Sequence, residues 1–274
     1  MLWEEIVAAA RQRGWSPRQV FQEEIHKAVL AALSREKAFT SIVFRGGTAL
    51  HLFYDNPRHS EDLDFVLHKK GQAYDLTAAS APVVAFVRQM FPFLDDVSID
   101  IQKNDWALQR LVLRTQSQRL AQRRRIHLEL AFVPAYRHRP RILTYPPLHP
   151  VVRVEEPSEI AADKATALAL RPYLKGRDLW DLYYLTAEQG HHIPWNLAFQ
   201  KAEDYGSTRA AFQAMLHKAA HKIRETGAAV LATELQRFLS PALLEHYQPL
   251  FPDIAGHVAE LTEQASGEED HEGR

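Results

Sequence analysis

The hydrophobic pattern between residues 42 and 67 predicts the segment around which the chain is organised. An apolar run at 42–44 predicts a short strand, and a Gly-Gly break leads from it into helical spacing over 48–54. After a polar loop at 55–60, the segment 62–67 alternates polar and apolar side chains, which predicts a second strand. Side chains two positions apart on a strand point to the same face. The second strand therefore directs its two aspartates to one face and its apolar residues into the core.

The remaining pattern predicts an α+β protein. Further helices are expected at 3–13, 17–35 and 78–90, and further strands at 97–102, 108–115 and 126–133. From residue 158 onward the spacing is helical almost throughout. About five strands, in the order strand, helix, strand, helix and then three strands, indicate an α+β or mixed sheet rather than a doubly wound one.

Breaks in this pattern predict three parts. A Pro-rich segment at 145–150 is typical of a linker, so we expect a sheet core with N-terminal helices over 1–150. A helical domain follows over 151–265. The acidic stretch 266–274 is typical of a disordered tail.

Composition narrows the function classes. The 274 residues carry a net charge of −1, so nucleic-acid binding would need a local basic patch. The absence of cysteine excludes disulfides and thiolate catalysis. No apolar run is long enough for a membrane span, and the N-terminus lacks the basic region of a signal peptide. We therefore expect a soluble, cytoplasmic protein.

Asp62 and Asp64 are the first candidate site. Two carboxylates at i and i+2 on a strand suit Mg²⁺, or Mn²⁺, which binds one or two protein carboxylates together with substrate phosphates. Many such Asp-x-Asp patterns are solvated turns, but this one has apolar flanks and follows a Gly-Gly turn. The pattern favours a metal site.

A third acid could complete the site. Glu129 lies between apolar residues on the predicted strand 126–133, where it could act as a further metal ligand or as a general base. It could equally face solvent on an alternating strand. Asp100 competes with it for this role.

Other residues could contact phosphates. The turn of Gly46, Gly47 and Thr48 could offer backbone N–H groups, with a hydroxyl from Ser60. Farther along, Lys164 and Arg171 share one helical face and could balance phosphate charge, although alone they would be read as a solvated face.

An arginine block could contact RNA. No acidic residue lies between Asp105 and Glu129, and this interval contains the candidate RNA-binding residues Arg119, Arg123, Arg124 and Arg125. The alternative is a hairpin edge whose charge prevents aggregation.

Two blocks of this sequence together resemble the AbiEii/AbiGii toxin family of nucleotidyltransferases, a branch of the DNA polymerase β-like superfamily. The first block is GGTAL at 46–50 followed by RHSEDLDF at 58–65. The second runs from the ADK at 162–164 to RDLWDLY at 177–183. The resemblance covers roughly residues 20–190.

The resemblance implies a nucleotidyltransferase core with a helical C-terminal domain. The implied reaction transfers a nucleoside monophosphate from an NTP with the help of Mg²⁺, and some members are toxins of toxin–antitoxin pairs that modify the tRNA acceptor end. By motif match, Asp62 and Asp64 would hold metal, while Ser60 and the Gly46-Gly47 turn would hold phosphates. Lys164 would contact the triphosphate.

The second block implies further roles. Asp178 and Asp181 would lie near the nucleotide or the catalytic centre, and Arg177 would pair with them or orient them. These residues, with Lys164 and Arg171, complete the expected nucleotide site.

Two other functions stay open at this point. The acceptor could be a protein side chain or a small molecule, or the group transferred could be a phosphoryl group. A non-catalytic nucleotide-binding module is the third possibility, although the retained acids at 62 and 64 argue against it.

Overall fold

The computed structural model describes residues 1–118 and 121–267, which fall into two compact units. Unit 1 comprises 1–55 and 59–155, and unit 2 comprises 56–58 and 156–274. The short loop 56–58 thus packs with the C-terminal helices although it lies early in the sequence.

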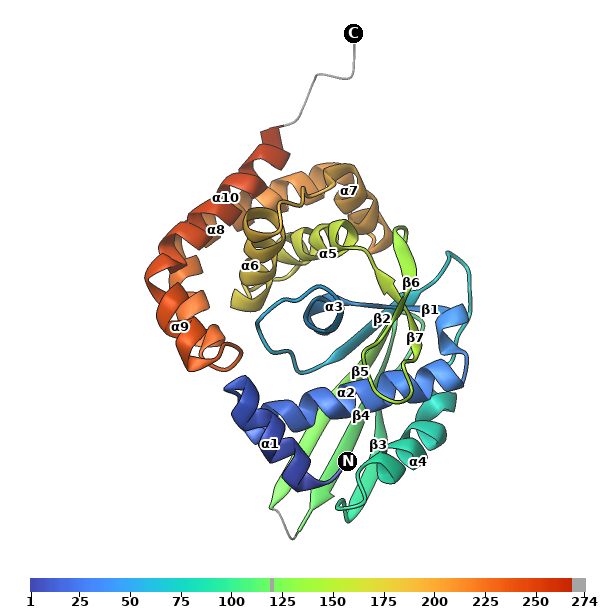
Figure 1. Cartoon of the computed structure of the whole chain (residues 1–274). Helices are drawn as coiled ribbons and strands as arrows, with labels where there is room; N and C mark the ends of the chain where they lie inside the picture. The colour runs from blue at the N-terminus through green and yellow to red at the C-terminus, as the bar shows by residue number, and fades with distance from the viewer. Residues whose placement is uncertain (119–120, 268–274) are drawn as a thin grey trace. The chain divides into compact units, whose positions relative to one another are not determined.

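Unit 1 is a mixed sheet with helices packed on it (Figure 1). Its helices are α1 (Trp3–Arg13), α2 (Pro17–Arg35), α3 (Gly46–Phe53) and α4 (Ser80–Met90), with short 3₁₀ segments at Ala38–Thr40 and Leu76–Ala79. Its strands are β1 (Ile42–Arg45), β2 (Leu63–Leu67), β3 (Asp96–Asn104), β4 (Leu108–Ser117), β5 (Gln122–Pro134), β6 (His138–Ile142) and β7 (Val151–Glu155). Within the described residues, seven strands form one sheet in the order β3-β4-β5-β2-β1-β7-β6. The predicted α+β class is confirmed.

Local sequence signals set the helix starts. Ser16 caps α2, because its hydroxyl accepts from the Gln19 N–H while the Gln19 side chain accepts from the Ser16 N–H. Pro17 occupies the first turn, where its missing N–H is not needed. Figure 1 shows α2 and α4 lying along one face of the sheet, where apolar residues of the strands are buried.

The two strands β6 and β7 correct the sequence-based reading of residues 145–150. This Pro-rich segment connects β6 to β7, whose antiparallel register pairs Ile142 with Val151. It is therefore a loop within the sheet and not a linker that leaves it. Charged residues on the exposed β6 masked the alternation that would have predicted a strand.

Unit 2 is helical. It consists of α5 (Pro157–Leu170), α6 (Gly176–Tyr183), a π-helical turn at Tyr184–Glu188, α7 (Trp195–Asp204), α8 (Arg209–Leu235), α9 (Pro241–Tyr247), a 3₁₀ segment at Gln248–Leu250 and α10 (Phe251–Gly267). The predicted tail began at 266, but α10 continues to Gly267; residues 268–274 lie outside the described residues. Within the described part of the chain, no helix combines the length and apolar character needed to cross a membrane.

Candidate functional site

Three acids share one face of the sheet in unit 1. The parallel register of β2 and β5 places Asp64 opposite Glu129, so their side chains leave the sheet on the same side. Asp62 lies two residues before Asp64 and belongs to the same face. Its Oδ1 atom is 3.0 Å from Nδ1 of His127, which lies two residues before Glu129 on β5. Strand pairing therefore gathers acids that are far apart in the sequence.

Cations flank this acidic group along the same row. The register continues from Arg45 on β1 through Asp64 and Glu129 to Arg110 on β4. The Arg110 Nε atom donates to Glu129 Oε1 over 2.7 Å. Positive charge on both sides reduces the repulsion between the two central carboxylates. Asp100, the competing third acid, lies on β3 and pairs with Arg114.

Gly46 allows the Asp64 carboxylate to approach the turn before α3. The φ angle of Gly46 is 79°, in the left-handed region that favours glycine. A Cβ atom added there would lie 2.8 Å from Asp64 Oδ2. The glycine therefore serves two purposes, a backbone turn and room for a carboxylate.

The backbone beside Asp62 is anchored by three side chains. The Thr48 hydroxyl donates to the Asp62 carbonyl. On α2, Gln22 Nε2 donates to the Glu61 carbonyl over 3.1 Å, and His26 Nε2 lies 3.0 Å from the same oxygen. Because a carbonyl oxygen accepts, we assign the ring hydrogen of His26 to Nε2. The Thr48 hydroxyl is thus committed to the protein backbone, so the predicted phosphate contact of Thr48 would use its backbone N–H.

His26 is neutral at pH 7. Burial lowers its pKa to about 4, and the contact with the Glu61 carbonyl and the charges of Asp62 and Glu23 only partly oppose this effect. A neutral imidazole donates one hydrogen bond to the Glu61 carbonyl without adding charge to the acidic face.

The start of α3 is suited to an anion. The N–H groups of Gly46, Gly47 and Thr48 lie in the first helical turn, where they have no acceptor within the helix. Ser60 lies in the loop between α3 and β2 and is largely buried at 7% exposure. The turn at 46–48, Ser60 and the acids at 62 and 64 all belong to unit 1, whereas Lys164 and Arg171 belong to unit 2.

The second predicted block forms a buried ion network in unit 2. The Lys164 amine lies 2.7 Å from Asp178 Oδ1 and 2.8 Å from Asp181 Oδ2. Burial alone would raise the pKa of Asp178, but Lys164 and Arg171 hold it far below its usual range. Burial would lower the pKa of Lys164, yet Asp178 and Asp181 raise it above its ordinary value. All these groups are therefore charged at neutral pH.

Asp181 holds the loop 56–58. Arg58 donates to both of its carboxylate oxygens, from Nε over 2.6 Å and from Nη2 over 2.5 Å. Asn56 Nδ2 adds a third hydrogen bond over 2.9 Å, and Trp180 Nε1 donates to the Asn56 amide oxygen. With 0% exposure, Asp181 cannot touch a nucleotide in this arrangement. Asp181 therefore positions this loop, and its place near the nucleotide or the catalytic centre stays a prediction.

The arginines of this block differ from expectation. Arg171, at the end of α5, pairs with Asp178. Arg177 lies 3.8 Å from Glu234 and its guanidinium stands over the Phe238 ring at 4.7 Å. Arg171 therefore pairs directly with Asp178, and the role that the resemblance implied for Arg177 stays a prediction.

The arginine block divides between two faces of β5. Arg123 and Arg125 are exposed on the face that carries His127 and Glu129. Arg124 points to the opposite face, is 5% exposed and stands 5.9 Å from the Phe21 ring centre. Burial and the nearby Arg18 lower its pKa to about 10. Arg124 is thus unavailable to RNA, contrary to expectation, and Arg119 lies outside the described residues.

The acidic face fits a divalent cation. Across residues 1–118 and 121–267, no group of three or more His, Asp or Glu side chains is placed so that it could hold a metal ion. Mg²⁺ does not need one, since it binds one or two carboxylates together with water and substrate phosphates. Asp62 and Asp64 would be the carboxylates of such a site, and Gly46 leaves room for the Asp64 carboxylate beside the turn.

Sequence reasoning missed several residues that support the site. His127 could have been found from the strand alternation, which places it on the face of Glu129. His26, Gln22 and Arg58 carry no local signal, because each acts on a segment distant in the sequence.

A family profile matches most of the chain. The family described as "Nucleotidyl transferase AbiEii toxin, Type IV TA system" matches residues 28–264. The chain therefore belongs to this family and is a nucleotidyltransferase. No match to a curated protein sequence reaches significance.

Solved structures show the same fold. A candidate nucleotidyltransferase from H. pylori is 20% identical, covers 93% of this chain and 100% of its own, and superposes with a TM-score of 0.58. JHP933 from Helicobacter pylori is 20% identical, covers 92% and 96% of the two chains, and gives a TM-score of 0.56.

Replacing Gly46 with alanine should separate stability from activity. Gly46→Ala and its control Gly71→Ala each place a Cβ at a φ near 80°, where an alanine costs about 1–2 kcal/mol. Gly71 has open space around it, whereas the new methyl at 46 displaces the Asp64 carboxylate. We expect similar losses in urea unfolding but at least a tenfold loss of nucleotidyl transfer for Gly46→Ala alone, about 1.4 kcal/mol in the barrier. Equal activity in the two variants would contradict the role of this contact.

His26 should make unfolding depend on pH between 6.5 and 4. In that window the unfolded chain binds a proton at this imidazole and the folded chain does not, so the free energy of unfolding falls as pH falls. The change attributable to His26 should reach about 3 kcal/mol at pH 4. Urea unfolding of His26→Gln should lack this slope, with the exposed His217→Gln as control. Parallel pH curves for wild type and His26→Gln would refute the assignment.

Proposed function

We propose that this nucleotidyltransferase of the AbiEii family transfers a nucleoside monophosphate from an NTP to the 3′ end of tRNA, and that it acts as the toxin of a toxin–antitoxin pair. The observation that supports this most strongly is the shared face of Asp62, Asp64 and Glu129, which strand pairing brings together. The tRNA acceptor and the antitoxin come from the family resemblance.

In this proposal Asp62 and Asp64 hold Mg²⁺ or Mn²⁺. When bound, the ion would neutralise charge on the triphosphate and polarise its phosphorus–oxygen bonds. The residues of the chain fix the ligands: His127 orients Asp62, while Thr48, Gln22 and His26 hold the backbone beside it.

We propose that the first turn of α3 binds the phosphates. The N–H groups of Gly46, Gly47 and Thr48 would donate to phosphate oxygens, and Ser60, in the loop that follows α3, would add its hydroxyl. We keep the assignment of Lys164 to the triphosphate, since its side chain is 13% exposed. Asp178 then acts through Lys164, by holding its amine in place and charged.

Glu129 is the proposed base for the attacking hydroxyl. Its carboxylate is partly exposed and lies opposite Asp64. It would accept the proton of the acceptor hydroxyl as the oxygen attacks the α-phosphorus and pyrophosphate leaves. Arg110 positions the Glu129 side chain for this step by donating to its Oε1 atom.

Arg123 and Arg125 are the proposed RNA contacts. They extend from the same face of β5 as Glu129 and are exposed, so RNA phosphates could approach them and the acids from one side. The retained alternatives are another acceptor, phosphoryl transfer, and nucleotide binding without catalysis.

The proposed reaction can be tested with labelled nucleotides. Purified protein is incubated with total tRNA, Mg²⁺ and each α-labelled NTP in turn, and γ-labelled NTP serves as the control for phosphoryl transfer. We expect α-label on tRNA, lost by at least a thousandfold in Asp62→Asn and Asp64→Asn because the metal ligands are gone. Label on the protein, transfer from the γ position, or undiminished transfer by Asp64→Asn would contradict the proposal.

The third acid can be assigned by comparing two variants. Glu129→Gln should lower kcat by about a hundredfold or more, as expected for loss of a general base. Asp100→Asn also removes an acid that is paired with an arginine, but on β3, which β4 separates from β5, and it should leave kcat unchanged. Single-turnover rates measure both. The opposite pattern would move the role to Asp100.

A further inference from the structure

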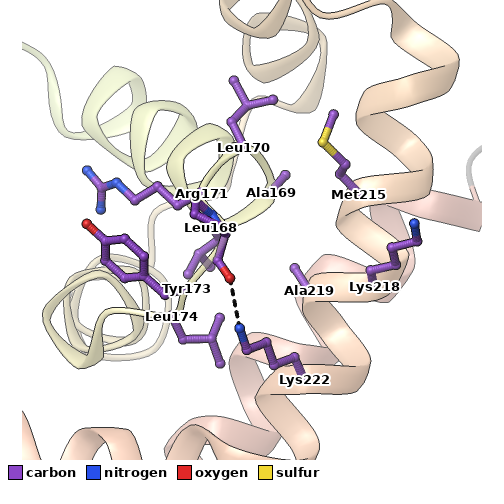
Figure 2. Close-up of a pocket in the computed structure, with 11 residues that line it drawn as sticks. Leu168, Ala169, Leu170, Arg171, Tyr173, Leu174, Met215, Lys218, Ala219 and Lys222 are labelled. Atoms are coloured by element: carbon purple, nitrogen blue, oxygen red, sulfur yellow. Dashed lines mark hydrogen bonds between the residues drawn. The ribbon is translucent and has the colours of Figure 1, made fainter.

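A cavity of about 310 Å³ lies within the helical unit, between the C-terminal end of α5 and the middle of α8 (Figure 2). The loop that leaves α5 closes one side of it. This volume is at the lower end of the range typical of small-molecule sites, and it is large enough for one nucleobase with part of its sugar.

The α8 wall combines apolar and cationic side chains. Met215, Lys218, Ala219 and Lys222 follow the spacing i, i+3, i+4 and i+7, so one helical face supplies all four. On the α5 side, Leu168, Ala169 and Leu170 line the cavity, and Figure 2 shows the Ala169 side chain pointing toward α8. The cavity thus has apolar walls with two amines on one side.

Charge on the lining has one sign. Of the described residues that line the cavity, three are cationic and none is acidic, although the whole chain has a net charge of −1. Lys222 donates to the Pro172 carbonyl over 3.0 Å, which holds its amine at the rim with two further hydrogens to donate. Arg171 is committed to Asp178, while Lys218 is exposed to solvent.

An aromatic ring lies on the outer side of the loop. Tyr173 is 56% exposed, and Figure 2 shows its side chain pointing away from α8. The Lys175 amine stands 6.0 Å from the ring centre. An exposed tyrosine beside a cation is a suitable stacking platform for a base with an adjoining phosphate.

We propose that this cavity binds a nucleotide near the single-stranded end of the acceptor RNA, with its base between the apolar walls and its phosphates at Lys218 and Lys222. The next base would stack on Tyr173. The proposal deepens the proposed function by giving the acceptor a second contact on the helical unit, and it rests on that function.

The chemistry favours RNA over the NTP. A triphosphate binds with a divalent cation, and cation ligands would be carboxylates, which the described lining lacks. A single-stranded RNA carries one charge per nucleotide, which separate lysines can match, and every base has a face that apolar or aromatic side chains can cover.

Direct binding tests the site without requiring catalysis. The probe is a fluorescently labelled single-stranded RNA ending in the tRNA acceptor sequence, titrated with full-length protein and followed by anisotropy. Lys218→Glu should weaken binding about tenfold, and Ala219→Trp, which fills the cavity, should do the same. Lys218→Ala should also lower the salt dependence of log Kd by about 0.7, the value for one lost phosphate contact on a single strand.

Matched controls separate charge from fold. Lys69→Glu makes the same charge change at an exposed position of unit 1, and its Kd should stay within twofold of the wild-type value. Thermal unfolding shows whether Ala219→Trp folds. If it does not fold, Lys218→Glu still tests the site, because Lys218 is exposed and its replacement should leave the fold intact.

The outcomes distinguish this proposal from the proposed function. Unchanged Kd and salt slope for the Lys218 variants would overturn the cavity proposal, while α-label transfer to tRNA would still support the proposed function. Binding that depends on Lys218 without any transfer would support the cavity proposal and remove the catalytic one. No binding of RNA by wild type, or displacement of the probe by an acidic peptide but not by unlabelled RNA, would overturn it.

Discussion

Repulsion between carboxylates on one face of a sheet is the constraint on which the acidic site depends. Opposite residues on neighbouring strands lie about 5 Å apart, and two like charges at that distance repel by roughly 3 kcal/mol at an effective dielectric constant of about 20. The strand register reduces this repulsion, because it places Asp64 and Glu129 between Arg45 and Arg110. Asp62 has His127 beside it. What remains is a partly exposed group of oxygens that a cation would stabilise further.

The helical unit treats its acids in the opposite way. Asp178 and Asp181 are buried and each contacts cations directly, so their charges are satisfied within the protein. Buried ion pairs of this kind are poor evidence for stability but strong constraints on geometry, because removing one partner leaves a charge stranded. The network therefore fixes Lys164 and the loop 56–58, and it leaves fewer groups free for a ligand than the sequence suggested. The partly exposed acids of unit 1 could therefore bind a cation, whereas the buried acids of unit 2 fix the positions of other residues.

Much of this could be predicted, and the failures have physical causes. Helix limits at α1 and α2 followed from caps and spacing, and the pair at Asp62 and Asp64 followed from strand alternation beside a Gly-Gly turn. The strands β6 and β7 were missed because an exposed edge strand and its partner carry no strict alternation. The hydrogen bonds of Thr48 and Asp181 were not predicted, because each joins residues that are distant in the sequence. Only tertiary packing decides such contacts. The sequence could not favour Glu129 or Asp100 as the third acid, because the strand register that places Glu129 opposite Asp64 is a tertiary feature.

In the arginine block, strand geometry decides which side chains share a face of the sheet. Consecutive arginines on β5 cannot form one surface, since side chains alternate between faces, and Arg124 was lost to the core for that reason. Arg123 and Arg125 remain on the face of Glu129, and four residues of strand separate Arg125 from Glu129 by roughly 13 Å. A slip of one residue in the register of β5 would turn these arginines inward, and Glu129 with them. The same pairing that gathers the carboxylates therefore also aligns the arginines, so an RNA strand held at Arg123 and Arg125 would run along β5 toward the acids rather than across the sheet.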